Sequence, residues 1–214
     1  MGRGRLISFE GLDGAGKTTQ MHLLEQWFIA RAFPYRRTRE PGGTPLGNEI
    51  RQLLLHRPDL EITPLAEAFL FQADRAQHFA KLVLPSLAAG IHVITDRCFD
   101  SSVAYQGVAR DVGAELVEQL SLVAMQGYVP DLTILLDLDP VLVQQRTLEK
   151  RYDDDTREEQ TRFDKEREEF HHRLRQAFLA LAHKHPERIK IIDALKAPEQ
   201  IHREIIALVE ALLV

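Results

Sequence analysis

The residues best suited to chemistry lie near the start of the sequence, in the run Gly11-Leu12-Asp13-Gly14-Ala15-Gly16-Lys17-Thr18. This run has the spacing G-x-x-x-x-G-K-[ST], follows a short apolar stretch and opens a segment of helical periodicity, as a phosphate-binding loop requires. Its glycines let backbone N–H groups turn toward phosphate oxygens, its lysine adds a positive charge, and its threonine hydroxyl is a ligand for Mg²⁺. The motif predicts a bound nucleoside triphosphate with Mg²⁺. The residues expected to hold the triphosphate are Gly11, Leu12, Asp13, Gly14, Ala15, Gly16, Lys17, Thr18 and Thr19.

The motif leaves the phosphoryl acceptor open among water, a hydroxyl group and a phosphate. A guanine-reading switch protein needs an Asn-Lys-x-Asp sequence, and the only asparagine, Asn48, precedes Glu49. An anionic acceptor mainly needs cations to hold it in line, whereas a hydroxyl needs a base. Arginines at pocket-compatible positions favour the phosphate, because a planar guanidinium binds phosphate oxygens in pairs. They are Arg39, Arg51, Arg75 and Arg97.

Two aspartates are candidates for the carboxylate that orients Mg²⁺ at the end of a buried strand. Asp96 follows the apolar run 91–95, and Asp137 ends the apolar run 132–137. The pattern alone does not rank them, because both follow an apolar strand.

The elements that must position these residues alternate along the chain. Apolar runs of strand length lie at 6–9, 91–95, 132–137 and 189–192, and helical periodicity covers 18–31, 65–84, 114–125, 140–150 and 197–213. Such alternation predicts an α/β fold with a doubly wound, mostly parallel sheet covered on both faces. Ligands of such sheets collect beyond the carboxyl ends of the strands. We expect residues 1–214 to form a single domain.

Composition narrows the class of protein further. The chain has 214 residues, a formal net charge of −5 and one cysteine, Cys98. No basic excess indicates nucleic acid or a membrane surface as a partner, and one cysteine excludes an internal disulfide. The sequence shows no 18-residue apolar run and no secretory leader, and the histidines lack metal-ligand spacing. These features predict a cytoplasmic protein.

One segment departs from the alternating pattern. From Arg146 to Arg175 the chain is densely charged. A solvated, salt-bridged pair of helices accounts for most of these residues, and a lid that carries arginine over the phosphates is the alternative reading. The run Asp153-Asp154-Asp155 lacks the glycine-containing spacing of a Ca²⁺ loop and is better explained as a solvated turn.

Several blocks together resemble the thymidylate kinase family of P-loop nucleoside monophosphate kinases. The resemblance covers nearly the whole chain. Besides the phosphate loop it rests on Thr38-Arg39-Glu40-Pro41-Gly42-Gly43-Thr44, on Phe71 with Asp74-Arg75-Ala76-Gln77-His78, on Asp96-Arg97, on Ser101-Ser102-Val103-Ala104-Tyr105-Gln106-Gly107 and on Pro130-Asp131-Leu132-Thr133. It implies transfer of the γ-phosphoryl group of MgATP to dTMP, giving dTDP and ADP, by a homodimer.

The resemblance also implies residue roles. Asp13 lies toward the acceptor nucleotide, and Arg39 and Arg97 bind its phosphate. Asp96 rather than Asp137 lies near the metal, which Thr18 also binds. For the nucleoside, Phe71 stacks on thymine, Arg75 hydrogen-bonds the base, Tyr105 packs against the deoxyribose, and Ser102 and Gln106 lie near the base. The expected catalytic residues are Lys17, Asp13, Arg97, Asp96 and Arg151.

Members of the family supply the transition-state arginine either from the phosphate loop or from the lid. Gly14 stands in the loop here, which implies a lid arginine, in a lid at roughly residues 146–162. Family lids are usually short and contain glycine, whereas residues 147–157 contain none. The candidates are Arg146, Arg151, Arg157 and Arg162, of which Arg151 is preferred. The rival interpretations are a deoxynucleoside kinase and a non-catalytic nucleotide-binding protein.

Overall fold

The computed structural model describes residues 2–143 and 168–213. Its centre is a five-stranded parallel sheet in the order β2-β3-β1-β4-β5. The strands are β1 (Leu6–Glu10), β2 (Tyr35–Arg39), β3 (His92–Asp96), β4 (Leu132–Asp137) and β5 (Ile189–Asp193). From β1 the chain continues to β2 on one side of the sheet, and from β3 it crosses to β4 on the other side. The carboxyl ends of the adjacent strands β1 and β3 therefore flank the switch point where such sheets bind ligands.

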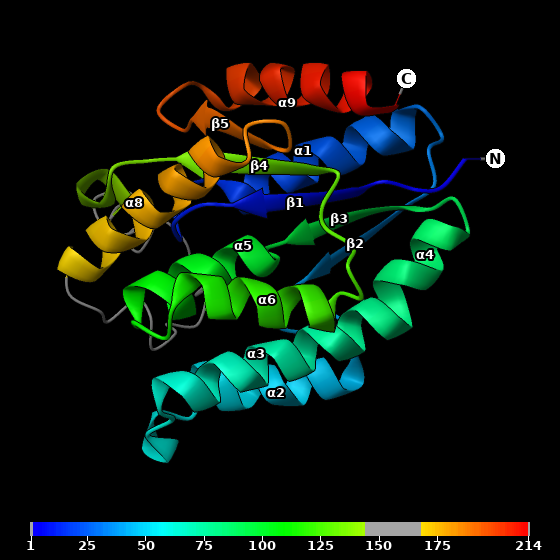
Figure 1. The fold of residues 1–214 in the computed structure, drawn as a ribbon. Helices are drawn as coiled ribbons and strands as arrows, with labels where there is room; N and C mark the ends of the chain where they lie inside the picture. The colour runs from blue at the N-terminus through cyan, green and yellow to red at the C-terminus, as the bar shows by residue number, and fades with distance from the viewer. Residues whose placement is uncertain (1, 144–167, 214) are drawn as a thin grey trace.

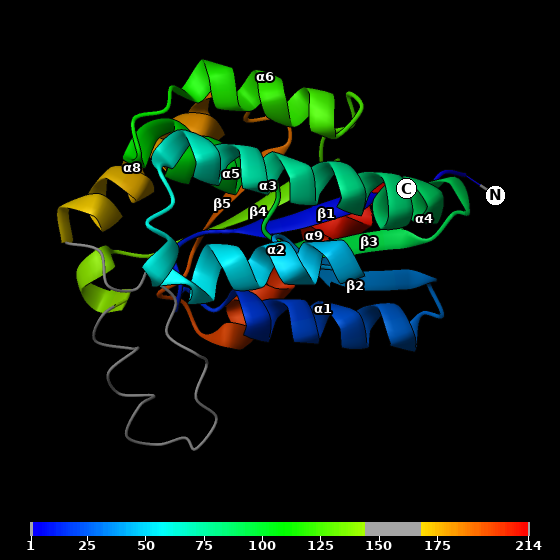
Figure 2. The same ribbon diagram turned by 90° about the horizontal axis from the view of Figure 1, so that it is seen from below.

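Helices cover both faces of the sheet, as Figure 1 shows. The helices α1 (Lys17–Ala30) and α9 (Pro198–Leu213) lie on one face. The other face carries α2 (Pro45–His56), α3 (Pro64–His78), α4 (Leu84–Ala88), α5 (Phe99–Ser102), α6 (Ala114–Ala124) and α8 (Glu168–Lys184). From below, α3 lies between α6 and α2 (Figure 2). Among the described residues there are also short η segments, which are a 3₁₀ turn η1 (Pro58–Leu60) and the π-helical η2 (Phe79–Val83) and η3 (Val103–Ala109).

Alternate residues of β1, β3, β4 and β5 pack into two separate hydrophobic cores. In β1, Ile7 and Phe9 pack with α1 and α9, while Leu6 packs into the cluster on the opposite face. Successive strand side chains point to opposite faces, which is why a sheet buried on both sides needs a continuous apolar run. The predicted fold class and the strands within β1, β3, β4 and β5 are therefore confirmed.

Two predictions about elements were incomplete. The strand β2 was not predicted, because it has one buried residue, Thr38, and its sequence Tyr-Arg-Arg-Thr-Arg has no apolar run. The predicted helix 65–84 is three pieces, α3, η2 and α4. Pro85 has no N–H to bond the carbonyl of Lys81, which interrupts the α-helical hydrogen-bond pattern. The residues just before it form the π-helical segment η2. The predicted helix 140–150 lies mostly outside the described residues.

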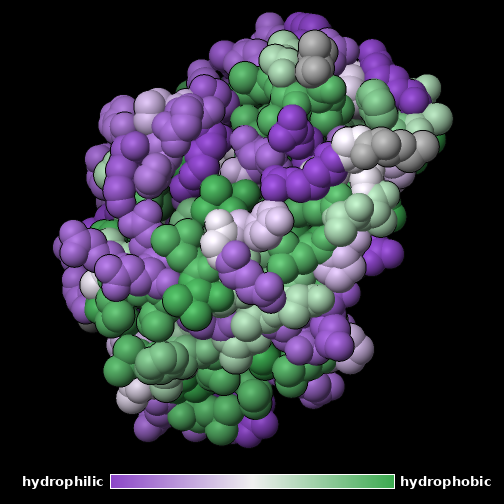
Figure 3. Space-filling model, turned by 45° about the vertical axis from the view of Figure 1, so that its right-hand side comes forward, coloured by the Kyte–Doolittle hydropathy of each residue, from purple (hydrophilic) through white to green (hydrophobic). Residues whose placement is uncertain are grey.

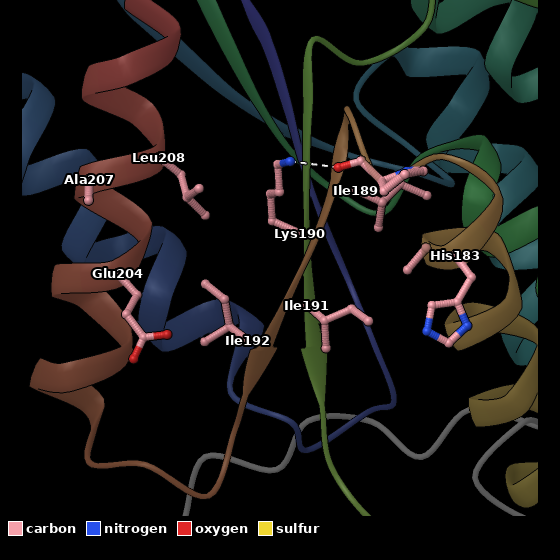
Figure 4. A pocket seen from close by; sticks show the side chains of 10 residues that line it. His183, Ile189, Lys190, Ile191, Ile192, Glu204, Ala207 and Leu208 are labelled. Carbon is pink, nitrogen blue, oxygen red and sulfur yellow. Dashed lines mark hydrogen bonds between the residues drawn. The ribbon is translucent and has the colours of Figure 1, made fainter.

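At the edge strand β5 the surface carries an open groove of about 490 Å³ between α8 and α9. Figure 4 shows Ile189, Ile191 and Leu208 among its lining side chains, and Lys190 donating to the carbonyl of Pro186 at 2.6 Å. None of its lining residues belongs to the predicted site. Among the described residues, no helix is both long and apolar enough to cross a membrane.

Candidate functional site

The phosphate loop joins the carboxyl end of β1 to the first turn of α1. Gly11 has a φ of 129°, and a β-carbon there would collide with the carbonyl oxygen of Leu136 in β4, so this position requires glycine. Lys17 is the first residue of α1 and is buried, with Nζ 3.2 Å from the Gly11 carbonyl oxygen and 3.1 Å from that of Leu12. Thr18 and Thr19 follow in the exposed first turn. The loop thus leads directly into the N-terminus of α1, which is the arrangement that the predicted phosphate site needs.

Asp13 lies between the two cations of the site. Its Oδ1 accepts hydrogen bonds from Arg97 Nη2 at 2.6 Å and from Lys17 Nζ at 3.3 Å. Burial raises the pKa of Asp13, but the charges of Arg97 and Lys17 outweigh burial and hold the pKa well below its ordinary value. The carboxylate is therefore ionised near neutral pH, and it connects the arginine with the lysine of the phosphate loop.

Arg97 is held by a framework of several side chains. It adopts a φ of 66°, in the left-handed region, and its guanidinium donates to the Tyr105 hydroxyl at 3.1 Å and to Ser101 Oγ at 2.9 Å. Ser101 in turn donates to the carboxylate of Glu10, which also accepts from the backbone N–H of Cys98 at 2.8 Å. A non-glycine residue in this region is strained, and strain of this kind gathers at functional sites.

The two candidate aspartates have different surroundings. Asp137 accepts two hydrogen bonds from Arg175, at 2.8 and 2.9 Å, and Arg175 also binds Asp139. Asp96 pairs in register with Phe9 of β1, and its Oδ1 is buried without a hydrogen-bond partner among the described residues. A buried carboxylate oxygen next to the phosphate loop calls for a ligand. The geometry therefore favours Asp96.

The end of β2 and the helix α2 carry two arginines, Arg39 and Arg51, near Arg97. Thr44 caps α2 by accepting from Gly47 N–H at 3.0 Å, and a β-carbon on Gly47 would meet Asp74 and the Gly42 carbonyl. Arg51, one turn further along α2, donates to the Pro41 carbonyl at 3.1 Å. Burial lowers the pKa of Arg51, and the charges of Arg39 and Arg97 act in the same direction. Arg51, one of the arginines that favoured a phosphate acceptor in the sequence, therefore lies close enough to Arg39 and Arg97 for their charges to act on it.

The predicted base-binding residues meet between α3 and the segment formed by α5 and η3. Arg75 is 1% exposed and donates to Gln72 at 2.8 Å and to Ser102 at 3.0 Å. Phe71, half-buried, lies in the same helix, and Tyr105 and Gln106 follow Ser102 by one turn. The structure thus gathers Phe71, Arg75, Ser102, Tyr105 and Gln106 along one wall.

Buried carboxylates that the sequence did not reveal brace this wall. Glu40 accepts from Arg75 Nε at 2.8 Å and from His78 Nδ1 at 2.9 Å, and His78 also bonds Thr38 at 2.7 Å. Burial raises the pKa of Glu40, but Arg75 and His78 hold it below its ordinary value. Glu67 accepts from Gln106 at 2.7 Å. In the sequence Glu40 stood out only as part of the block 38–44 that carries the family resemblance, and Glu67 had no signal.

The predicted lid and the metal ligands complete the set of predicted site residues. The lid at roughly 146–162, with Arg146, Arg151, Arg157 and Arg162, lies outside the described residues. Within the described ranges, no group of three or more His, Cys, Asp or Glu is arranged to hold a metal by itself. A cation held partly by phosphates needs only one or two protein ligands.

Comparison with known proteins assigns the chain to a family. A family model described as thymidylate kinase matches residues 9–205. The chain belongs to the thymidylate kinase family. The alternative families considered from the sequence, deoxynucleoside kinases and non-catalytic nucleotide-binding proteins, are not favoured.

Relatives within the thymidylate kinase family match over nearly their full length. A thymidylate kinase of Leifsonia xyli is 49% identical over 204 residues, covering 94% of this chain and 92% of the relative. One of Carboxydothermus hydrogenoformans is 41% identical and covers 98% of both chains. The crystal structure of thymidylate kinase from Ehrlichia chaffeensis superposes with a TM-score of 0.75 at 32% identity, covering 97% of this chain and 99% of that one. The P-loop NTPase fold is thereby confirmed.

Proposed function

We propose that this protein transfers the γ-phosphoryl group of ATP to the 5′-phosphate of dTMP, giving dTDP and ADP. The observation that carries the proposal is the position of Asp13, whose carboxylate joins Lys17 of the triphosphate cradle to Arg97 of the acceptor cluster. Two groups of cations therefore face each other across one carboxylate, as in-line transfer between two phosphates requires.

On the donor side, the backbone N–H groups of Gly11 to Lys17 and the Lys17 ammonium bind the triphosphate. On the acceptor side, the guanidinium groups of Arg39, Arg51 and Arg97 hold the dTMP phosphate, and an oxygen of that phosphate attacks the γ-phosphorus. The ADP oxygen leaves, and no covalent enzyme intermediate forms. The cations stabilise negative charge that spreads over the transferred group.

The nucleoside part of dTMP lies along the wall between α3 and η3. Phe71 stacks on thymine, Arg75 and Ser102 lie at its edge with Gln106, and Tyr105 packs against the deoxyribose. Tyr105 also accepts a hydrogen bond from Arg97. The Tyr105–Arg97 hydrogen bond therefore connects the nucleoside site with the phosphate site.

The residues present fit a Mg²⁺ ion bound with ATP. The buried Asp96 Oδ1 has no partner in the described part of the chain, and the Thr18 hydroxyl lies in the exposed first turn of α1. These oxygens would supply the one or two protein ligands that Mg²⁺ takes when phosphates and water supply the others. When bound, the ion neutralises charge on the phosphates.

The remaining cation is proposed to come from the lid, with Arg151 preferred among Arg146, Arg151, Arg157 and Arg162. The support is Gly14, which leaves the loop without an arginine of its own. Replacing each of the four by alanine identifies the residue as the one whose loss lowers kcat while ATP binding persists. A kcat equal to that of the wild type in all four variants contradicts this assignment.

A homodimer is proposed from an uncovered apolar face on three neighbouring helices. Figure 3 shows hydrophobic side chains gathered over the lower part of the molecule, where Figure 1 places α2 and α3. The exposed apolar residues of α2, α3 and α6 are Leu46, Leu53, Leu65, Phe69, Leu116, Leu122 and Val123, of which Val123 is 79% exposed. A face of this kind marks an interface. Light scattering is expected to give twice the chain mass of 24.4 kDa, and a monomer contradicts the proposal.

A coupled assay for ADP tests the central reaction. ATP is supplied with dTMP, dUMP, dCMP, dGMP or thymidine as the acceptor. We expect saturable turnover with dTMP at the highest kcat/KM. Turnover with thymidine alone identifies a deoxynucleoside kinase instead, and ATP binding without turnover identifies a non-catalytic protein.

A further inference from the structure

The base-binding wall contains two buried carboxamides whose orientation decides what they recognise. A carboxamide donates from its nitrogen and accepts with its oxygen, and the two ends have nearly the same shape. Neighbouring groups therefore decide which end faces a ligand. Gln72 of α3 is 7% exposed and Gln106 of η3 is 1% exposed.

Gln106 is oriented by Glu67. The Gln106 Nε2 lies 2.7 Å from Glu67 Oε1, and Glu67 is 1% exposed. Arg110 Nε lies 3.8 Å from the same oxygen, so this carboxylate also attracts a guanidinium. An ionised carboxylate only accepts hydrogen bonds, so the nitrogen of Gln106 must face Glu67 and the oxygen must face away. That oxygen is buried and has no partner among the described residues.

Gln72 is oriented in the opposite sense by Arg75. Its Oε1 accepts from Arg75 Nη1 at 2.8 Å, and a guanidinium only donates. The Gln72 nitrogen therefore faces away from Arg75, and it too is buried without a partner in the described part of the chain. Two charged residues thus leave one acceptor and one donor unsatisfied, which is costly unless a ligand pairs with them.

Both unsatisfied atoms belong to the place where the base is proposed to stack. Glu67 lies one helical turn before Phe71, and Gln106 lies one turn after Ser102, which accepts from Arg75 at 3.0 Å. Side chains four residues apart share a helix face. The contacts Glu67–Gln106 and Arg75–Ser102 therefore link α3 to the opposite wall at two points, about two turns apart on α3, with Phe71 between them.

The imide edge of thymine complements this arrangement. N3–H is a donor and the flanking carbonyl oxygens are acceptors, whereas cytosine offers an acceptor at N3 and a donor at the neighbouring amino group. We infer that Glu67 is a specificity-determining positioning residue, which turns the Gln106 oxygen toward the base so that the pocket takes a pyrimidine with N3–H and rejects cytosine. This inference rests on the proposed function.

The carboxylate of Glu67 acts through Gln106 and does not touch the base. A cytosine in the same position sets its N3 lone pair against the Gln106 oxygen and leaves buried polar groups unpaired. Sites built to bond a substrate N–H reject an analogue that lacks it by a large factor for this reason. With a neutral residue at position 67 the Gln106 carboxamide can rotate by 180° at little cost, and the discrimination against cytosine weakens.

The test is the variant Glu67→Gln, assayed for kcat/KM with dTMP, dUMP and dCMP. Glutamine can donate or accept, so the Gln106 carboxamide is free to turn. We expect the dTMP-to-dCMP ratio of kcat/KM to fall by about tenfold or more, in line with the discrimination carried by one hydrogen-bonded pair. The dTMP-to-dUMP ratio should stay at the wild-type value, because uracil has the same imide edge. Glu67→Asp, which keeps the carboxylate, should restore part of the discrimination.

A second variant keeps the inference testable if Glu67→Gln does not fold, as judged by its thermal unfolding. Gln106→Met keeps a similar shape and leaves Glu67 beside Arg110, and it should lower kcat/KM for dTMP and dUMP more than for dCMP. An unchanged dTMP-to-dCMP ratio in either folded variant overturns the inference. A wild-type protein without turnover of dTMP overturns the proposed function instead, so the two failures are distinguishable.

Discussion

At the scale of single residues, the site is organised by charged groups that share partners. Asp13 is bonded by Lys17 and Arg97 at once, and Arg97 also reaches Ser101 and Tyr105. Each cation is therefore held at a fixed place before a phosphate arrives. Preorganised charge of this kind is worth more than mobile charge, because it does not reorganise during the reaction.

Lys17→Ala is expected to lower kcat by about a hundredfold or more, since it removes a fixed cation from the transferred phosphate. Steady-state kinetics with ATP and dTMP measures the change. Lys81→Ala is the matched control, because Lys81 is an exposed lysine in η2. Equal kcat in the two variants would show that Lys17 does not act on the phosphate.

Phe71→Ala is expected to weaken dTMP binding by about 1–3 kcal/mol, the value of stacking one base on an aromatic ring. The ATP affinity should not change, because the phosphate loop is a separate element. Calorimetric titration with each nucleotide measures both quantities. Phe71→Tyr, which keeps the ring, should bind dTMP nearly as the wild type does, and unaltered dTMP affinity in Phe71→Ala removes the ring from the base site.

At the scale of elements, the loop after β2 and the helix α3 act as one unit. Glu40 of the loop binds Arg75 and His78 of α3, and Gly42 N–H donates to Asp74 at 3.0 Å. The π-helical η3 carries Tyr105 and Gln106 opposite them. π segments are frequent at functional sites because they redirect side chains.

Glu40→Ala is expected to lower the free energy of unfolding by about 3–5 kcal/mol, because it leaves a buried guanidinium without its carboxylate. Glu40 is 3% exposed and Arg75 is 1% exposed. Urea denaturation measures the change, with Glu49→Ala, at an exposed position of α2, as the control. A loss no larger than that of the control would mean that the pair does not hold loop and helix together.

At the scale of the whole molecule, parallel strands bring distant chain segments to one edge of the sheet. The carboxyl ends of β1 and β3 adjoin, which sets Glu10 beside the turn that follows Asp96. Burial, and then the charge of Asp100, raise the pKa of Glu10 to about 8. This burial couples folding to pH.

Between the ordinary pKa of 4.5 and the folded value of about 8, folded Glu10 binds more protons than the unfolded chain does. Its contribution to stability is therefore complete below pH 4.5 and is lost as the pH rises through about 8. Glu10→Gln, which cannot ionise, is expected to gain stability relative to the wild type as the pH rises from 5 to 9.

Urea denaturation of both proteins across this range measures the difference. Comparing the two proteins cancels the other titrating groups, such as Asp74, whose pKa burial raises to about 7, and His92, whose pKa burial lowers. A difference that does not change with pH contradicts the raised pKa of Glu10.

The sequence by itself determined the phosphate loop, the family and most strands, because those signals are local. A glycine spacing or an apolar run can be recognised from about ten consecutive residues. The predictions for Phe71, Arg75 and Arg97 also rest on local signals, because their neighbours in the chain form recognisable blocks. The edge strand β2 was missed because an edge strand is only partly buried and needs no apolar run.

Only the tertiary structure decided which carboxylates are buried and what they hold. Glu40 meets Arg75 across 35 residues, Glu67 meets Gln106 across 39, and Glu10 meets Ser101 across 91. In the sequence each is one acidic residue among many, most of which are solvated. The energy of a buried charge depends on the partner that satisfies it, and that partner is chosen by the packing of the sheet and helices, not by the adjacent chain.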